Sequence, residues 1–337
     1  MVYRKTRKAN LALAFLLLVL ATNFLLYQSG VPDFLSLPLT SGVAIGSLID
    51  LAIVAPILVY VAFKISIKQT IGLMVFGLVL ARFLIPVKLY EPYKGILYTG
   101  LALEALLVFA ELALVFIVIR KGSAIRSEMK VMNEGAIYSL LPTVEKVATK
   151  NVFIRLLMTE FLMFYYALFT WKKKASSHEG VVTMHKKTSA IAINIMLIHA
   201  ILIETIGIHW WLHEKSLVLS IILLVLNVYS VFFIIADIQI TRLHPMEIKN
   251  GKLYITQGMA SRIVVTLTNI KEVEWGSTLP NKQTLQFIYK DFEKTDPQAI
   301  VRLHEPVEAV MFMGVKKKVT EFAIRVDEPE KLKQLLL

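Results

Sequence analysis

Seven long apolar segments constrain the fold of this chain more than any other feature. An α-helix rises about 1.5 Å per residue, so about 20 apolar residues cross the hydrocarbon core of a bilayer. Hydrophobic residues make up 56% of the chain, against about 45–50% in an ordinary globular domain. The sequence therefore predicts a polytopic α-helical membrane domain of about seven helices, at residues 10–28, 42–63, 70–87, 96–119, 152–171, 189–208 and 217–239.

The N-terminus is basic and leads directly into the first apolar segment, with the sequence MVYRKTRKAN before it. No small-residue cleavage site is convincing there, and six more apolar segments follow, so we expect a retained first span and not a signal peptide. Basic residues collect on the cytoplasmic side of membrane spans. We therefore expect a multi-pass protein of the plasma membrane with a cytoplasmic N-terminus.

The fifth segment, 152–171, leaves two topologies open. With seven crossings, the inner loops hold 4, 2, 6 and 1 Lys and Arg residues, a total of 13, and the outer loops hold 7. If 152–171 lies on the membrane without crossing it, the inner count becomes 18 and the outer count 3. The positive-inside rule favours this second arrangement, which also makes the C-terminal region cytoplasmic. The segment is nevertheless apolar on nearly every face, as a spanning helix would be.

The net charge of +12 is concentrated in the membrane part of the chain. Residues 1–239 hold 22 Lys and Arg against 13 Asp and Glu, whereas residues 240–337 hold 15 against 12. Cytoplasmic loops and contact with anionic lipid explain this surplus, so we expect membrane lipid as a partner and no nucleic acid. The chain has no cysteine, which excludes disulfides and thiolate metal sites.

After residue 239 the pattern changes to short alternating runs typical of strands. Asn250-Gly251 lies between two such runs and is the strongest short hairpin signal. A helix is expected at the end, in DEPEKLKQLLL, opened by Asp327 and a proline in its first turn. The division is therefore a transmembrane helical domain at 1–239 and a β-rich barrel or sandwich with a C-terminal helix at 240–337. Further strands are predicted at residues 262–267, 270–275, 283–290, 299–305, 309–314 and 320–326.

This C-terminal order resembles the bacterial pleckstrin-homology-like domains over about 90 residues. The stretches that carry the resemblance are KNGKLYI, VTLTNIKEVEW and VDEPEKLKQLL. The resemblance implies a recognition or assembly module that binds a protein partner or anionic lipid, in a bacterial plasma-membrane protein. The run MGVKKKVTEF fits either a lipid-facing turn or a solvated hairpin tip.

Ionisable residues inside the apolar segments form the predicted intramembrane polar site. Such residues are costly in a bilayer and mark ion or substrate paths by default. Five acids accompany a single arginine, so most of the carboxyl groups must be protonated, hydrated or bound to a cation. The residues are Asp50, Arg82, Glu104, Glu111, Glu160, His199 and Glu204.

Helical spacing limits what these groups can do together. Glu104 and Glu111 are seven residues apart, so they share a face about 10 Å apart along the axis, as two stations on one path would. His199 and Glu204 point about 140° apart, and no HExxH pattern lies in the span. His209 and His213 have the i, i+4 spacing of a metal pair, although tryptophans between them are typical of an interfacial belt. A divalent metal at His199, Glu204, His209 and His213 is therefore one interpretation, and interfacial or hydrogen-bonding roles are the other.

Three functions stay open. The first is proton or cation transport or sensing along the acidic site. The second is a metal-dependent intramembrane enzyme acting on a lipid or isoprenoid, because seven helices with interior His, Asp and Glu resemble the alkaline ceramidase group and bacterial proteins labelled β-carotene 15,15′-monooxygenase. Those sites use several interior histidines, whereas here only His199 is clearly inside. The third is a non-catalytic membrane scaffold or regulator. No phosphate-binding glycine loop or nucleophile motif is present, so the sequence leans away from an enzyme.

Overall fold

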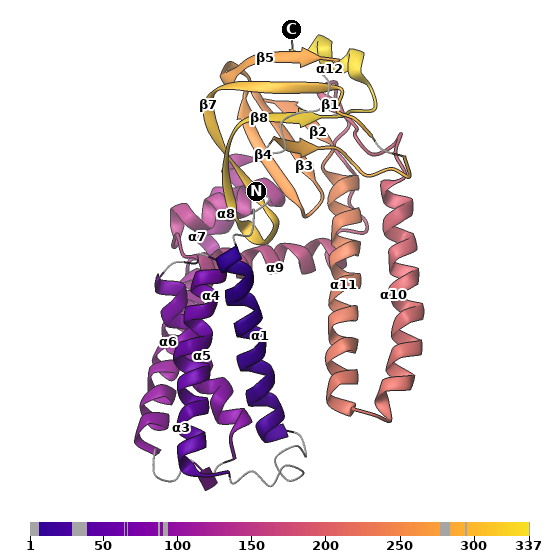
Figure 1. The fold of residues 1–337 in the computed structure, drawn as a ribbon. Coiled ribbons are helices and arrows are strands. Elements are labelled where there is room, and N and C mark those ends of the chain that lie inside the picture. The colour runs from indigo at the N-terminus through magenta and orange to yellow at the C-terminus, as the bar shows by residue number, and fades with distance from the viewer. Residues whose placement is uncertain are drawn as a thin grey trace. The chain divides into compact units, whose positions relative to one another are not determined.

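The computed structural model describes residues 7–28, 39–63, 65, 67–86, 88–89, 94–276, 284–293 and 295–336 (Figure 1). The chain divides into two compact units, Met1–Leu114 and Val115–Leu337. About ten α-helices precede the sheet in the described residues, more than the seven predicted. Five of them are long and apolar enough to cross a membrane, at Ala9–Tyr27, Gly42–Phe63, Val152–Phe169, Ala190–His213 and Leu217–Leu243.

The first unit is a bundle of helices at the first four predicted segments. Figure 1 shows α1, α4 and α5 running side by side. The buried core of this bundle contains small and branched side chains, including Ala44, Leu48, Leu51 and Ala81. The elements are α1 (Arg7–Gln28), α3 (Ser41–Ile49), the π-helical turn η1 (Asp50–Val54), α4 (Ala55–Phe63), α5 (Ile67–Leu84) and α6 (Lys94–Arg120), which continues into the second unit.

A widened turn interrupts the second of these helices. The Ala55 N–H donates to the Asp50 carbonyl five residues back, which defines the π-helical segment. Pro56 follows at once, and a proline removes the N–H that a regular helix would need and clashes with the carbonyl four residues earlier. Gly77 of α5 packs against this turn so closely that a Cβ would overlap the Leu51 carbonyl. Proline and a glycine contact therefore account for the π turn.

The second unit begins with two amphipathic helices that the sequence analysis did not predict. They are α7 (Gly122–Met132) and α8 (Ala136–Val147). The buried face of α8 includes Ile137, Leu141 and Val144, which recur at helical spacing. Both helices are shorter than a membrane span, so the apolar-segment pattern places residues 122–147 in a loop between two spans.

Helix α9 (Val152–Phe169) lies across one end of α11 (Leu217–Leu243), whereas α10 (Ala190–His213) and α11 form a long antiparallel hairpin (Figure 1). The Asn151 side chain caps α9 by accepting the N–H of Phe153 at 2.8 Å. Phe164 of α9 packs on Phe232 of α11, with ring centroids 5.7 Å apart. The segments corresponding to the last three predicted apolar runs are therefore helices, but they differ in direction.

The C-terminal region is a mixed sheet curled into a half-barrel. Its strands run in the order β1-β2-β3-β4-β7-β8-β6, with β5 paired to β7. Among the strand pairs of the described residues, β6–β8 is parallel and the others are antiparallel. Asn250 and Gly251 both have positive φ, as the predicted β2–β3 hairpin requires. The bounds are β1 (Val181–Val182), β2 (Met246–Lys249), β3 (Lys252–Gln257), β4 (Ser261–Thr266), β5 (Ile270–Trp275), β6 (Leu285–Phe287), β7 (Ala299–Met311) and β8 (Lys316–Ile324), followed by α12 (Pro329–Leu336).

Several details differ from the predicted strands and C-terminal helix. Residues 299–305 and 309–314 were predicted as two strands, but β7 is continuous, with a register shift between Arg302 and Val307. A two-residue strand, β1, comes from the loop between α9 and α10 and pairs with β2. Asp327, predicted to open the C-terminal helix, lies two residues before α12, and its carboxylate accepts the N–H groups of Lys186 and Lys187 of the α9–α10 loop at 2.9 Å. Residue 283, the first of the predicted 283–290 strand, lies outside the described residues.

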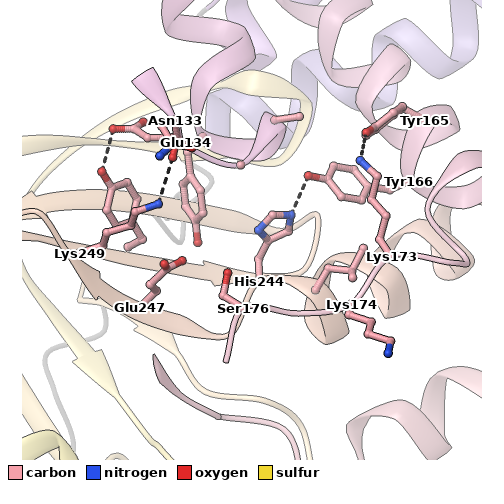
Figure 2. Close-up of a pocket in the computed structure, with 15 residues that line it drawn as sticks. Asn133, Glu134, Tyr165, Tyr166, Lys173, Lys174, Ser176, His244, Glu247 and Lys249 are labelled. Carbon is pink, nitrogen blue, oxygen red and sulfur yellow. Dashed lines mark hydrogen bonds between the residues drawn. The ribbon is translucent and has the colours of Figure 1, made fainter. Parts of the chain in front are cut away.

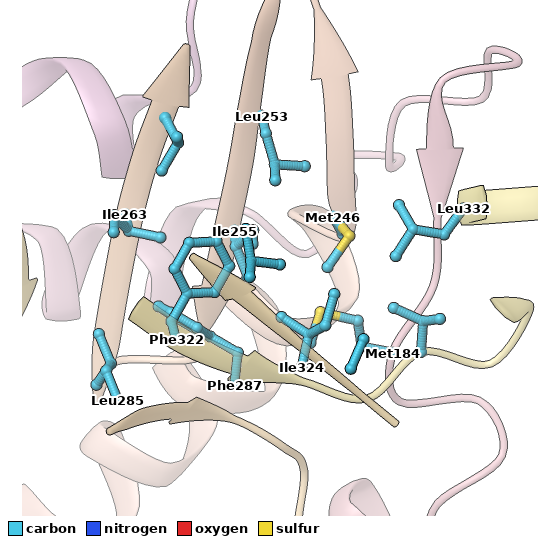
Figure 3. Close-up of a cluster of buried hydrophobic side chains, with 14 of the residues drawn as sticks. Met184, Met246, Leu253, Ile255, Ile263, Leu285, Phe287, Phe322, Ile324 and Leu332 are labelled. Atoms are coloured by element: carbon cyan, nitrogen blue, oxygen red, sulfur yellow. The ribbon is translucent and has the colours of Figure 1, made fainter. Parts of the chain in front are cut away.

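The core of the half-barrel lies between the curled sheet and α12 (Figure 3). Phe287 and Phe322 are fully buried and meet edge to face, with centroids 5.8 Å apart. Leu332 of α12 is also fully buried in this cluster, and Met184 joins it from the α9–α10 loop. The loop before α10 is therefore part of the same folded unit as the sheet.

The far end of the β7–β8 hairpin docks on helices of the same unit. Lys316, in the predicted lysine turn, bonds Glu145 of α8 at 2.6 Å. Gly314 has a positive φ of 72° and packs on Arg155 and Thr159 of α9. Lys317 and Lys318 are exposed. One lysine of the turn thus has a buried structural partner, while the other two face outwards.

Candidate functional site

A polar cavity of about 310 Å³ lies where α8, α9 and the end of α11 meet the sheet (Figure 2). The α7–α8 turn supplies Glu134 and Gly135, and α9 supplies Tyr166. His244 directly follows the last residue of α11, and β2 contributes Glu247. Three stretches far apart in the sequence, within 133–138, 165–176 and 243–254, therefore build one cavity.

His244 is held inside this cavity as a neutral base. Its Nε2 lies 2.7 Å from the Tyr166 hydroxyl, which accepts the Ile137 N–H at 3.2 Å. If Nε2 donated instead, the buried hydroxyl proton would have no acceptor on the imidazole, so we assign the tautomer in which Tyr166 donates to Nε2 and the imidazole proton is on Nδ1. Burial, with a smaller effect from the charge of Lys173, lowers the pKa of His244 to about 4.

Gly135 allows this placement of the imidazole. A Cβ at Gly135 would lie 2.5 Å from His244 Cε1, closer than real Cβ atoms approach a heavy atom. The Tyr138 ring packs edge-on against the same imidazole, with centroids 5.9 Å apart. The start of α8 and the end of α11 are thus fitted to each other around His244.

The cavity lining combines three lysines with two carboxylates that already have partners. Glu134 accepts from the Tyr254 hydroxyl at 2.7 Å and pairs with Lys252 at 3.2 Å. Glu247 pairs with His178 at 2.7 Å. The three lining lysines, Lys173, Lys174 and Lys249, have no carboxylate partner within ion-pair distance in the described part of the chain. Lys249 donates to the Asn133 carbonyl at 3.3 Å, and Lys173 bonds the Tyr165 hydroxyl.

A buried arginine adds positive charge behind the cavity. Arg262 of β4 is 4% exposed, and its Nη2 has no hydrogen-bond partner among the described residues. Burial lowers the pKa of Arg262 to about 10, opposed by the nearby Tyr138 and Tyr166 hydroxyls. Both tyrosines line the cavity. The site therefore carries an excess of positive charge on its wall and behind it.

Among the described side chains of the first unit, no hydrogen bond or ion pair joins the predicted intramembrane residues Asp50, Arg82 and Glu111. Asp50 lies at the start of η1, 3.4 Å from the Asn23 amide nitrogen. Arg82 is in the last turn of α5, and Glu111 is exposed on α6. Glu104 is also in α6, but its side chain lies outside the described part. The two-station arrangement of Glu104 and Glu111 therefore stays a prediction.

The residues predicted in the second unit each have a local environment of their own. Glu160 of α9 accepts from the Tyr229 hydroxyl at 2.9 Å. His199 is exposed on α10 and bonds the Ile195 carbonyl of its own helix, at 2.8 Å. Glu204 is exposed as well. Among described side chains, no hydrogen bond or ion pair joins any two members of the predicted site.

Of the predicted metal ligands, His209 and His213 are neighbours on α10. His209 and His213 lie with ring centroids 5.5 Å apart, and His209 Nδ1 bonds the Ser220 hydroxyl at 2.6 Å. In the residues that the structure describes, no group of three or more His, Asp or Glu side chains is placed to hold a metal ion. Lys215 lies over the Trp211 ring at 3.9 Å, in keeping with an interfacial belt.

Comparison with known families, curated proteins and solved structures finds no match to this chain. The resemblance to pleckstrin-homology-like domains therefore stays a prediction, and the structure itself establishes a curled β half-barrel with a C-terminal helix. The geometry of the His244 cavity and of the helices beside it is therefore what bears on function.

The sequence analysis did not single out His244, Tyr166 or the lysines as one site. Two signals were nevertheless present: a histidine five residues after the last predicted apolar segment, 217–239, and the lysine run 172–174 directly after the segment 152–171. Each marks the level at which an apolar helix leaves the bilayer. That they lie side by side depends on how α9 packs, which no local pattern encodes.

Proposed function

We propose that this is a membrane-anchored recognition protein whose His244 cavity binds the phosphate of an anionic lipid headgroup. The observation that carries the proposal is the cavity itself, which lies at the end of a membrane-length apolar helix and has three lining lysines with no carboxylate partner among the described residues. Phosphate is the anion that clustered lysines and neutral N–H and O–H donors favour at a membrane surface.

The position of the cavity supports a lipid ligand over a free anion. Leu243 ends α11, and His244, the next residue, lines the cavity. On the adjoining helix α9, Phe161, Phe169 and the following Trp171 expose 56%, 71% and 60% of their surfaces. A tryptophan exposed at a helix end is typical of the headgroup region, and the exposed phenylalanines extend an apolar surface along α9. A headgroup could therefore enter the cavity while its acyl chains stay in the bilayer.

The contacts of α9 favour the topology in which it lies along the membrane. Before α9, Glu134 bonds Tyr254 and Glu145 bonds Lys316, both in the half-barrel. After α9, Val181 pairs with Glu247 of β2. A helix whose two flanking segments both contact one polar domain does not separate them by a bilayer. We infer six crossings with the half-barrel in the cytoplasm, as the lysine and arginine counts favour.

Single cysteines in this cysteine-free chain test that topology. We expect Ser127→Cys and Ser177→Cys, which flank α9, to react with a membrane-impermeant maleimide only after permeabilisation of cells. Glu214→Cys, in the turn between α10 and α11, should react on intact cells. All three positions are exposed. Labelling of Ser127→Cys and Ser177→Cys from opposite sides would show that α9 crosses and would refute the in-plane arrangement.

Charge removal tests the headgroup site. The double variant Lys173→Gln/Lys174→Gln should weaken binding of short-chain phosphatidylglycerol by about 10–30-fold, because each lysine near an anionic surface contributes about 1 kcal/mol. Phosphatidylcholine should bind weakly to both proteins. The measurement is lipid retention by the detergent-solubilised protein, followed by native mass spectrometry across a lipid titration.

The matched control is Lys317→Gln/Lys318→Gln, which removes the same charge from an exposed pair in β8. We expect this variant to bind lipid as the unaltered protein does. Equal loss in both double variants would indicate diffuse attraction and not a site. Loss of lipid binding only in Lys317→Gln/Lys318→Gln would place the lipid contact at the lysine turn of β8, the lipid-facing alternative for MGVKKKVTEF.

The other two predicted functions have less support. The acidic path for a proton or cation has no hydrogen bond or ion pair between its described members. Asp50 itself lies at the start of the π turn, beside Asn23. A lipid-directed metalloenzyme would need several ligands together, and the described side chains offer no such group. Both stay predictions from the sequence.

A further inference from the structure

A compact polar cluster lies inside the first unit, between α1 and the junction of α3 with η1. Asn23 and Tyr27 are one turn apart on α1, and Ser47 and Asp50 are nearly one turn apart on the facing helix. The Tyr27 hydroxyl donates to Ser47 Oγ at 2.9 Å, and Asn23 Nδ2 lies 3.4 Å from Asp50 Oδ2. Two polar pairs therefore meet between membrane-length helices.

Asn23 leaves an acceptor without a donor in this cluster. The residue is 3% exposed, and its Nδ2 donates to the Val19 carbonyl at 2.9 Å. That bond fixes the orientation of the amide, because a flip would place Oδ1 against the carbonyl. Oδ1 has no hydrogen-bond partner in the described part of the chain. A buried acceptor without a donor costs about 1–3 kcal/mol, so it calls for a donor or a cation.

Asp50 adds a carboxylate that lacks a counter-ion. Among the described residues, no ion pair joins it to a Lys, Arg or His, Arg82 of the neighbouring α5 included. Charges inside membrane helices are otherwise paired or face an ion path. The π turn that begins at Asp50 loosens the regular backbone bonding there, a feature frequent at functional sites.

We propose that Asn23, Ser47 and Asp50 bind a monovalent cation of the sodium type between α1 and the π turn. The donors are all oxygen atoms, which suits hard cations and not the metals that favour nitrogen or sulfur. A single carboxylate neutralises one positive charge, so a divalent ion would leave net charge in an apolar surrounding. This site is independent of the headgroup cavity and involves none of its residues.

The test is direct binding of ²²Na⁺ to the full-length protein in neutral detergent. We expect saturable binding that unlabelled sodium chloride displaces and choline chloride does not. Asn23→Leu, an apolar change that a membrane helix tolerates, should weaken binding at least ten-fold, and Asp50→Asn should do the same. Glu111→Gln removes an exposed acid from the same unit and should leave binding unchanged.

Gel filtration and helical circular dichroism establish that each variant is folded before its binding is compared. If Asp50→Asn fails to fold, Asn23→Leu alone still decides the question. Absence of ²²Na⁺ binding to the unaltered protein would overturn the proposal, and so would unchanged binding in folded Asn23→Leu. Equal loss in Glu111→Gln would also overturn it, since binding would then reflect general negative charge.

Discussion

Gly258→Ala is expected to open the β3–β4 hairpin and detach it from α11. Gly258 has a φ of 52°, and a Cβ there would overlap the Asp237 carboxylate of α11. That carboxylate accepts the Met259 N–H at 2.8 Å and the Asn194 amide at 3.0 Å, so it joins the hairpin turn to both long helices of this unit. Left-handed strain of about 1–2 kcal/mol adds to overpacking of about 1–3 kcal/mol, a total of about 2–5 kcal/mol.

Gly251→Ala is the matched control for this prediction. Gly251 also has a positive φ, of 69°, but a Cβ there would meet nothing within 4 Å. Its cost should be the backbone strain alone, about 1–2 kcal/mol. Hydrogen–deuterium exchange of the β3–β4 amides in the full-length protein measures the local opening free energy of each variant. Equal costs in the two variants would mean that Asp237 moves aside freely and that the hairpin is not fixed to α11.

Acidification is expected to destabilise the second unit through His244. In the folded protein the pKa of His244 is about 4, whereas an unfolded chain protonates histidine at about 6.5. Between these values the unfolded state binds the extra proton, so stability is complete above pH 6.5 and falls as the pH drops towards 4. The expected loss from this group is about 2 kcal/mol at pH 5 and about 3 kcal/mol at pH 4.

The His244→Gln variant separates this effect from the protonation of carboxylates. Thermal unfolding midpoints in detergent at pH 7.5 and pH 5 should fall about 4–8 °C further in the unaltered protein than in the variant, given about 2–4 °C per kcal/mol in units of this size. The variant itself should be less stable at neutral pH, because it loses the bond from Tyr166. An identical pH response in both proteins would show that His244 does not stay neutral in the folded state.

The headgroup proposal and this pH response concern the same cavity and can be compared. If the cavity holds a phosphate near His244, the negative charge should raise the pKa of the imidazole. The pH-dependent loss of stability should then become smaller in saturating phosphatidylglycerol than in neutral detergent. The same loss of stability with and without phosphatidylglycerol would indicate that no phosphate binds near His244.

Local features of the sequence were sufficient to predict the long apolar helices and part of the sheet. The apolar segments at 10–28 and 217–239 are helices because long apolar runs satisfy their backbone polar groups internally. The β2–β3 hairpin forms at Asn250-Gly251 because both residues adopt positive φ readily. The sequence also showed which ionisable residues, such as Asp50, lie in apolar segments, but it did not show which side chains they contact. Asn23, which lies beside Asp50, gave no signal of its own.

The tertiary structure decided the orientation of α9 and, with it, the candidate site. A pattern that is apolar on every face does not distinguish burial by lipid from burial by protein, and α9 has one face on α8, α11 and the β7–β8 hairpin and another that is exposed. Pairing of Val181 with Glu247 and closure of the cavity around His244 join residues more than 60 positions apart. The sequence alone determined which segments are apolar enough to enter a bilayer, because that depends on composition within a window of about 20 residues. Which of them cross, and which polar side chains meet, depends on long-range packing that no such window contains.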